Sequence, residues 1–133
     1  MVHVDGSGSP GVFQTRRLVL RPVTRDDTSL LLELNSDPEV MRYITGRPST
    51  AEEVATEVNQ AIGSRWLAFR RDTGEFVGWF GAVPDPTGTE YEIGWRLRQS
   101  AWGHGFASEG ARALIEGLFT RREVEGCTRR QWP

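Results

Sequence analysis

The chain has 133 residues, of which 38% are hydrophobic and 26% are charged, and its formal net charge is −2 at pH 7. These values are typical of one globular domain, and the charge gives no general surface for nucleic acid. The single cysteine, Cys127, excludes an internal disulfide framework, and the distance in sequence between His3 and His104 disfavours a histidine-based metal site. No apolar run approaches the ~20 residues of a membrane span. We therefore expect a cytoplasmic enzyme or binding domain without a metal, membrane or nucleic-acid partner.

The first half of the chain predicts one strand followed by short helices. Residues 1–11 are small, polar and rich in glycine and serine, as in a flexible leader. Residues 13–22 alternate apolar and polar side chains and end at a proline, which predicts a half-buried strand. Thr24, with Asp27 three residues later, indicates a capped helix start. Helical spacing of apolar residues then predicts three short helices, which include residues 30–34, 40–44 and 54–62, and Ser49 or Thr50 is expected to cap the third.

From residue 66 onward the pattern changes to the period of strands. Residues 66–70, 76–83 and 90–97 are predicted strands, and the turn residues between the first two predict a hairpin. Consecutive strands of this kind favour an antiparallel meander. An amphipathic helix is expected at about residues 108–119. The order strand, helices, three strands and helix predicts an α+β domain.

A glycine-containing turn, WGHGFA at residues 102–107, lies between the last predicted strand and the last predicted helix. Gly103 and Gly105 permit backbone conformations that a Cβ disfavours, and they let a ligand approach closely. The helix that follows offers unpaired N–H groups and the positive end of its dipole at its first turn. Together these features predict a seat for a phosphate or pyrophosphate. The alternative is an ordinary strand-to-helix turn.

Several separate motifs resemble the GNAT superfamily of acetyl-CoA-dependent N-acetyltransferases, and most of all its branch of ribosomal-protein N-terminal acetyltransferases. Trp102, Gly105 and Ala107 occupy the three specified places of the superfamily pattern Gln/Arg-x-x-Gly-x-Gly/Ala. Trp102 departs from Gln/Arg, but a Trp-Gly-x-Gly start is usual in this branch. The resemblance spans about residues 13–125. Its motifs are TRRLVLRP at 15–22, DPEVMRY at 37–43, FVG at 76–78, EIGWRL at 92–97 and WGHGFASE at 102–109.

The resemblance implies acetyl-CoA as the cofactor and a primary amine as the acceptor, either a protein N-terminus or a small molecule. It implies that backbone N–H groups of the glycine turn hold the pyrophosphate, and that the strand end near Arg96 and Leu97 bonds the pantetheine arm. Glu92 is the candidate general base, and the plainer interpretation is a solvated strand residue. The predicted cofactor-binding residues are Arg96, Leu97, Trp102, Gly103, His104, Gly105, Phe106, Ala107 and Ser108.

The motifs stop after the helix that follows the glycine turn. The resemblance therefore implies the N-terminal part of a GNAT-like fold: a mostly antiparallel sheet of about four strands, helices on its faces, and missing C-terminal strands. Residues 12–125 are the expected domain. Residues 126–133 are expected to be an aberrant or disordered tail, which a frameshift near Gly126 would explain. The family's usual general acid, a tyrosine from the later part, has no counterpart in Tyr43 or Tyr91.

Three functions are compatible with these predictions. The first is acetyl-CoA-dependent N-acetyl transfer by a shortened GNAT domain. The second is CoA binding without catalysis, by a remnant of such a domain. The third is an interaction module, because an unpaired strand edge invites the addition of another strand. The same edge predicts a homo-oligomer that covers it.

Overall fold

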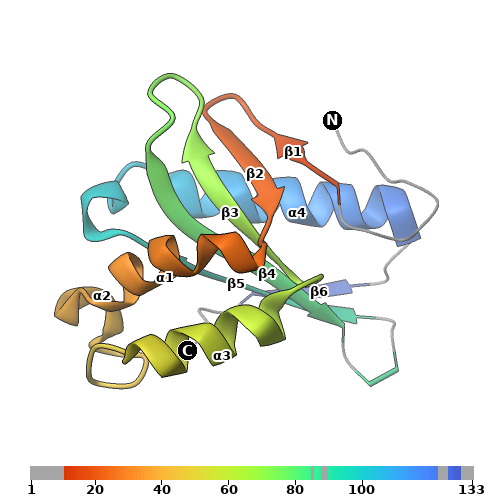
Figure 1. The fold of residues 1–133 in the computed structure, drawn as a ribbon. Helices are drawn as coiled ribbons and strands as arrows, with labels where there is room; N and C mark the ends of the chain where they lie inside the picture. Colours follow the sequence, from red (N-terminus) through yellow and green to blue (C-terminus); the bar gives the residue numbers. More distant parts are fainter. Residues whose placement is uncertain (1–10, 85, 88–89, 123–125, 130–133) are drawn as a thin grey trace.

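The computed structural model describes residues 11–84, 86–87, 90–122 and 126–129. The fold is α+β, as the sequence predicts: one six-stranded sheet in the order β1-β2-β3-β4-β5-β6, with helices on both faces (Figure 1). Residues 1–10 of the predicted leader fall outside the described residues, and Gly11 is buried. In chain order the elements are β1 (Phe13–Gln14), β2 (Leu18–Pro22), η1 (Arg25–Asp27), α1 (Thr28–Asn35), α2 (Pro38–Met41), α3 (Ala51–Ala61), β3 (Arg65–Arg70), β4 (Phe76–Pro84), β5 (Glu90–Leu97), η2 (Gln99–Ala101), α4 (Phe106–Arg122) and β6 (Gly126–Arg129).

The predicted first strand, residues 13–22, is two strands joined by a tight turn. The Thr15 N–H donates to the Leu18 carbonyl at 2.9 Å, and the Leu18 N–H donates to Thr15 Oγ1 at 2.9 Å. These bonds fold β1 back on β2, with Phe13 opposite Leu20. The prediction of one continuous strand was wrong. The Thr15 hydroxyl bonds the backbone nearby, and such local hydrogen bonds compete with the hydrogen bonds that pair strands.

The last described strand, β6, falls within the expected tail at residues 126–133. β6 lies parallel to β5, with Gly126 opposite Glu90 and Arg129 opposite Ile93. The origin of this segment from a frameshift stays a prediction. The sheet therefore has more strands than the four predicted. A four-residue strand shows no usable alternation in the sequence, and its pairing arises from the crossover through α4.

The remainder of the predicted tail, residues 130–133, lies outside the described part of the chain. Pairing between β5 and β6 ends at Ile93. All other neighbouring strands pair antiparallel, as the predicted meander requires.

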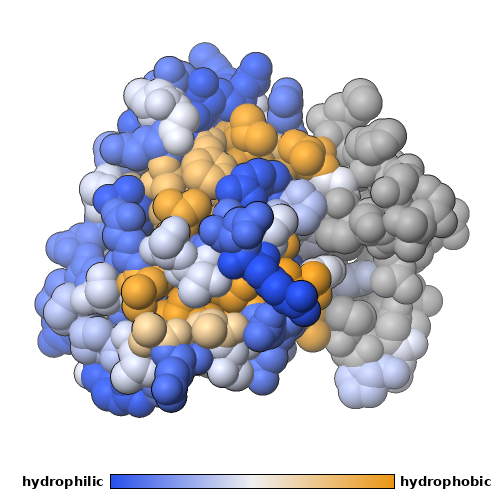
Figure 2. All heavy atoms as spheres, in the orientation of Figure 1, coloured by the Kyte–Doolittle hydropathy of each residue, from blue (hydrophilic) through white to orange (hydrophobic). Residues whose placement is uncertain are grey.

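Two buried clusters hold the three layers together. Neighbouring residues of a strand face opposite sides, so Phe80 packs toward α4 while Trp79 packs toward α1, α2 and α3. The outer surface on the α1–α3 side shows hydrophilic residues around apolar patches (Figure 2). The α4 cluster includes Phe13, Leu18, Leu20, Trp66, Ile93, Phe106 and Leu114, and the opposite cluster includes Val23, Leu31, Leu34, Met41, Val54, Val58 and Leu67.

Side chains satisfy the helix starts where the sequence predicts caps. At η1 the Thr24 N–H donates to Asp27 Oδ2 at 2.8 Å, which confirms the aspartate as a short stand-in for glutamate in a capping box. At α3 the cap is Thr50: its N–H donates to Glu53 Oε1 at 2.8 Å, and the Glu53 N–H donates back to Thr50 Oγ1. Arg47 also binds Glu53, and its hydrogen bonds, with those of Thr50, lower the pKa of Glu53 to about 2.

Candidate functional site

The glycine loop, which we define as residues 102–105, connects η2 to α4. Gly103 has φ 79° and Gly105 has φ 80°, so both lie in the left-handed region that the sequence predicts. A Cβ built on Gly103 would meet no protein atom within 4 Å. The space beside this glycine is therefore open to a ligand.

The helix after the loop begins at Phe106, two residues earlier than predicted. Its first helical hydrogen bond runs from the Glu109 N–H to the Gly105 carbonyl at 3.1 Å. The N–H groups of Phe106 and Ala107 precede this bond and have no helical acceptor. They add to the positive end of a 17-residue helix dipole, which favours an anion at this place.

A cavity of about 430 Å³, the loop cavity, lies between the glycine loop, the end of β5 and α2. It brings together most of the predicted cofactor-binding residues. Sequence reasoning missed the contribution of α2, since nothing local indicates that residues 39–43 face the loop. The predicted residues at the cavity are Leu97, Trp102, Gly103, Gly105, Phe106, Ala107 and Ser108, and Glu39, Val40, Tyr43, Trp95 and Ala101 complete its lining.

Trp102 ties the loop to the end of β5. Its indole Nε1–H donates to the Leu97 carbonyl at 3.0 Å, while the ring stays 45% exposed at the cavity. This contact fixes the loop relative to the strand end. The Trp102 side chain therefore holds the glycine loop against β5 and also exposes part of its ring to the loop cavity.

His104 does not line the loop cavity. Its side chain is exposed, and its ring lies 5.7 Å from that of Phe106. Its carbonyl accepts a hydrogen bond from Arg17 Nη1 at 2.9 Å. The backbone of His104 therefore belongs to the loop's support, and its imidazole lies outside the cavity lining.

The Arg96 side chain lies on the opposite face of β5 and is only 1% exposed. Its Nη1 donates to Asn35 Oδ1 at 2.7 Å, and both Nη atoms lie 3.2 Å from the carboxylate of Glu57. The prediction of cofactor binding at Arg96 therefore applies to its backbone alone. A buried guanidinium held by a carboxylate and an amide is a structural group.

Glu92 lies half-buried on the same face of β5 as Arg96, because alternate residues of a strand share a face. Leu97 and the loop cavity lie toward the other face. Glu92 does not line the loop cavity. Its role as a general base stays a prediction.

Sequence reasoning missed a cluster around Glu109, which lies in the first turn of α4. Arg17 Nε donates to Glu109 Oε1 at 2.6 Å, and the Arg17 N–H donates to Oε2 at 2.8 Å. The Thr15 hydroxyl also binds Oε2. Partial burial alone would raise the pKa of Glu109, but the hydrogen bonds from Thr15 and Arg17 outweigh it and lower that pKa. No local signal joins residues 92 positions apart.

Among the described residues, no group of three or more His, Cys, Asp or Glu side chains is arranged to hold a metal ion. None of the described helices combines the length and the apolar character that crossing a membrane requires.

Comparisons with known proteins agree on one family. The acetyltransferase (GNAT) domain matches residues 17–130. The chain is 36% identical over 127 aligned residues to the FsC-acetyl coenzyme A-N(2)-transacetylase of Aspergillus fumigatus, which covers 80% of this chain and 52% of that protein. It is 34% identical over 115 residues to the N-acetyltransferase p20 of Bacillus licheniformis, covering 80% of this chain and 65% of that one. The chain thus spans between about half and two thirds of the length of these relatives.

Solved structures share the fold. A GNAT-family acetyltransferase from Bacillus anthracis superimposes with a TM-score of 0.77 at 26% identity, covering 85% of this chain and 69% of that one. RimL, a ribosomal L7/L12 alpha-N-protein acetyltransferase solved in complex with coenzyme A, superimposes with a TM-score of 0.73 at 21% identity, covering 85% and 70%. The second likeness bears on the fold alone.

Proposed function

Because this chain belongs to the GNAT acetyltransferase domain family, we propose that it transfers an acetyl group from acetyl-CoA to a primary amine. One observation carries the proposal: the loop cavity opens directly onto the glycine loop and the N-terminus of α4. A cavity with an anion-binding end and an otherwise largely apolar and aromatic lining suits a ligand that joins a pyrophosphate to an acyl thioester arm.

The described residues fit such a ligand at both ends. At the pyrophosphate end, Gly103 and Gly105 keep side chains out of the way, and the N–H groups of Phe106 and Ala107 donate. The pantetheine arm would lie along the apolar wall at Leu97. Acetyl-CoA supplies the activated acetyl group, and the chain's own residues bind and orient it.

The transfer itself requires a base. The amine nitrogen attacks the thioester carbonyl carbon, the C–S bond breaks, and the amine's proton must leave while the thiolate gains one. Glu92 is the candidate base. Because it lies on the face of β5 opposite the loop cavity, it would take the amine's proton through a water molecule and not directly. A second candidate function, CoA binding without catalysis, follows if this carboxylate cannot reach the amine.

The acceptor is proposed as a protein N-terminus or a small-molecule amine. One relative is named an N(2)-transacetylase, and this name supports transfer to an amine nitrogen. Incubation with acetyl-CoA and a panel of amines and N-terminal peptides, with released thiol as the readout, identifies the class. Acetyl-CoA binding without thiol release for any acceptor would favour the non-catalytic alternative.

Calorimetry with CoA and acetyl-CoA tests the binding site, with Gly103→Ala as the probe and Gly46→Ala as its matched control. Both glycines have positive φ, 79° and 87°, and a Cβ on either meets no protein atom within 4 Å. The two substitutions therefore strain the backbone alike, and only the first adds a methyl group beside the loop cavity. We expect weaker CoA binding for Gly103→Ala alone. No binding by the unmodified protein at millimolar ligand would remove the proposal.

We also propose a homo-oligomer. The sheet order begins with β1 and ends with β6, so each of these edge strands has one side without a strand partner within the described residues. Exposed edges invite pairing with another chain. Light scattering over a range of concentrations tests this, and a monomer at every concentration would exclude it.

A further inference from the structure

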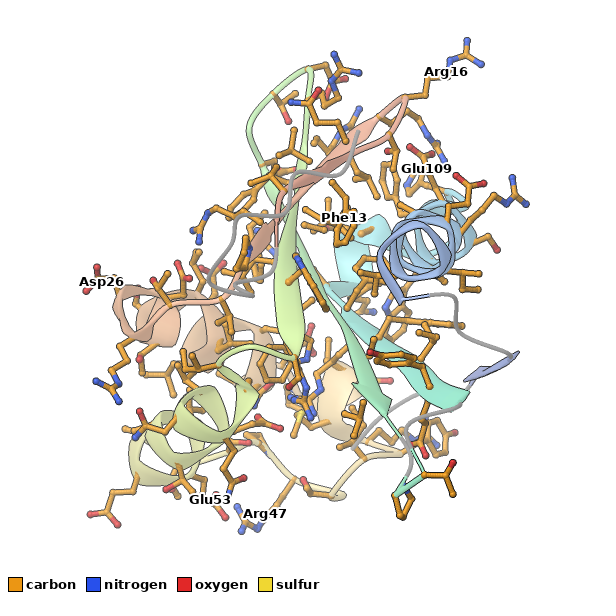
Figure 3. The ribbon with its side chains drawn as sticks, turned by 90° about the vertical axis from the view of Figure 1, so that its right-hand side faces the viewer. Phe13, Arg16, Asp26, Arg47, Glu53 and Glu109 are labelled. Carbon is orange, nitrogen blue, oxygen red and sulfur yellow. The ribbon has the colours of Figure 1, made fainter. Side chains whose placement is uncertain are left out.

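Arg17 makes four kinds of contact with the start of α4, from the turn between β1 and β2. Its Nε and its backbone N–H bind the two carboxylate oxygens of Glu109, at 2.6 and 2.8 Å. Its Nη1 binds the His104 carbonyl at 2.9 Å, and its guanidinium lies 4.5 Å from the ring centre of Phe106. Glu109 and the β1–β2 turn lie side by side, whereas the neighbouring Arg16 points away from α4 (Figure 3).

The bond to His104 determines how the next peptide group is oriented. The His104 C=O and the Gly105 N–H belong to one planar trans peptide unit, so they point in opposite directions. Since the carbonyl points to Arg17, the Gly105 N–H points away from it. Arg17 lines a hollow of about 640 Å³ on one side of Gly105 and does not line the loop cavity, which Gly105 also borders.

The bond to Glu109 determines the charge at the same place. An unpaired carboxylate in the first turn of α4 would repel an anionic ligand bound at that helix end. Arg17 supplies the balancing positive charge beside it, and its fork can serve Glu109 and the His104 carbonyl together. With Glu109 balanced in this way, the α4 dipole and the N–H groups of Phe106 and Ala107 make the electrostatic potential at the glycine loop positive.

We propose that Arg17 is a positioning residue that turns the Gly105 N–H toward the loop cavity and neutralises Glu109, so that the loop accepts a pyrophosphate. This inference rests on the proposed acetyl-CoA site and names the residue that shapes it. Arg17 itself does not border the loop cavity, so its effect on a ligand there passes through the loop backbone.

The test compares Arg17→Ala, Arg17→Lys and the control Arg16→Ala, which removes the same charge from an exposed neighbour in the turn. Binding of CoA is measured by calorimetry, and binding of pantetheine, which has no pyrophosphate, by ligand-observed NMR. We expect Arg17→Ala to weaken CoA about tenfold to a hundredfold, the range for losing a hydrogen bond to a charged group. The affinity of Arg17→Ala for pantetheine should stay unchanged. The Arg16→Ala protein should bind CoA as tightly as the unmodified protein does.

Arg17→Lys decides between orientation and charge, and it replaces the alanine variant if that variant does not fold. A lysine keeps the charge but lacks the fork, so CoA binding should stay weakened. Full recovery with lysine, an equal loss for CoA and pantetheine, or unchanged CoA binding in Arg17→Ala would each overturn the inference. In ligand-free protein the Gly105 amide resonance should shift in both Arg17 variants and not in Arg16→Ala. This shift does not require CoA, so it tests the role of Arg17 even if the proposed CoA site fails.

Discussion

Gly110 of α4 lies directly against the buried ring of Phe80 in β4. A Cβ on residue 110 would stand 2.7 Å from Cε1 of that ring and nearer still to its tip. Phe80 is 0% exposed, so it has no free space into which to move. The glycine therefore sets the distance between α4 and the sheet, and with it the place of the glycine loop at the helix's start.

Gly110→Ala should destabilise the protein although alanine is the better helix former. The gain in helix propensity is about 1 kcal/mol, whereas overpacking a rigid core costs about 1–3 kcal/mol. The difference is about 0–2 kcal/mol, and we expect a net loss toward the upper end in urea unfolding, because the added Cβ would approach the ring so closely. Phe80→Leu should cost less in the Gly110→Ala background than alone, because the smaller side chain relieves the clash. Additive effects would contradict the contact.

Glu57→Ala should destabilise the protein by about 3 kcal/mol, the usual cost of breaking a buried ion pair. Glu57 faces Arg96 at 3.2 Å and Arg65 at 3.7 Å, with Arg96 only 1% exposed. Its removal leaves the buried Arg96 and the partly buried Arg65 without their carboxylate. Chemical unfolding measures the loss, and Glu52→Ala, at an exposed position of the same helix, is the control. Equal effects of the two substitutions would contradict a buried ion pair.

Acid should remove the stability that Asp27 contributes. Burial alone would raise the pKa of Asp27, but hydrogen bonds from the Arg21 guanidinium and the Thr24 N–H outweigh it and lower that pKa. A lowered folded pKa means that the contribution is complete above about pH 4, the unfolded value, and is lost as the pH falls through the folded pKa. Urea unfolding from pH 7 to pH 2 should show a shallower decline for Asp27→Asn. Asp26→Asn, at an exposed neighbour, is the control. The same decline in all three proteins would contradict the prediction.

Ending the chain at residue 125 should promote association. This change removes β6 and leaves the edge of β5 at residues 90–93 unpaired, and unpaired edges template pairing with other chains. The control is a chain that ends at residue 129, which keeps β6 intact. Light scattering should show a concentration-dependent rise in mass for the shorter chain relative to this control. Equal masses at all concentrations would show that β6 does not protect the edge.

The sequence by itself determined the features that depend on neighbours in the chain. The caps at Thr24 and Thr50, the three-strand meander and the positive φ of Gly103 and Gly105 are all confirmed. Each arises from a local cause: a side chain that bonds its own backbone, an alternation of apolar residues, or a residue without a Cβ. These causes operate within a few residues, so they are readable without the fold.

Only the tertiary structure decided what lies opposite the glycine loop. It placed α2 at the loop cavity opposite the glycine loop, turned the Arg96 side chain to the far face of β5, paired β6 with β5 and joined Arg17 to Glu109 across 92 residues. These relationships depend on how the sheet is ordered and how α4 crosses it. Strand pairing and side-chain contacts between distant segments leave no periodic pattern in the sequence. The glycine loop was therefore readable in the chain, while the residues that surround and support it were not.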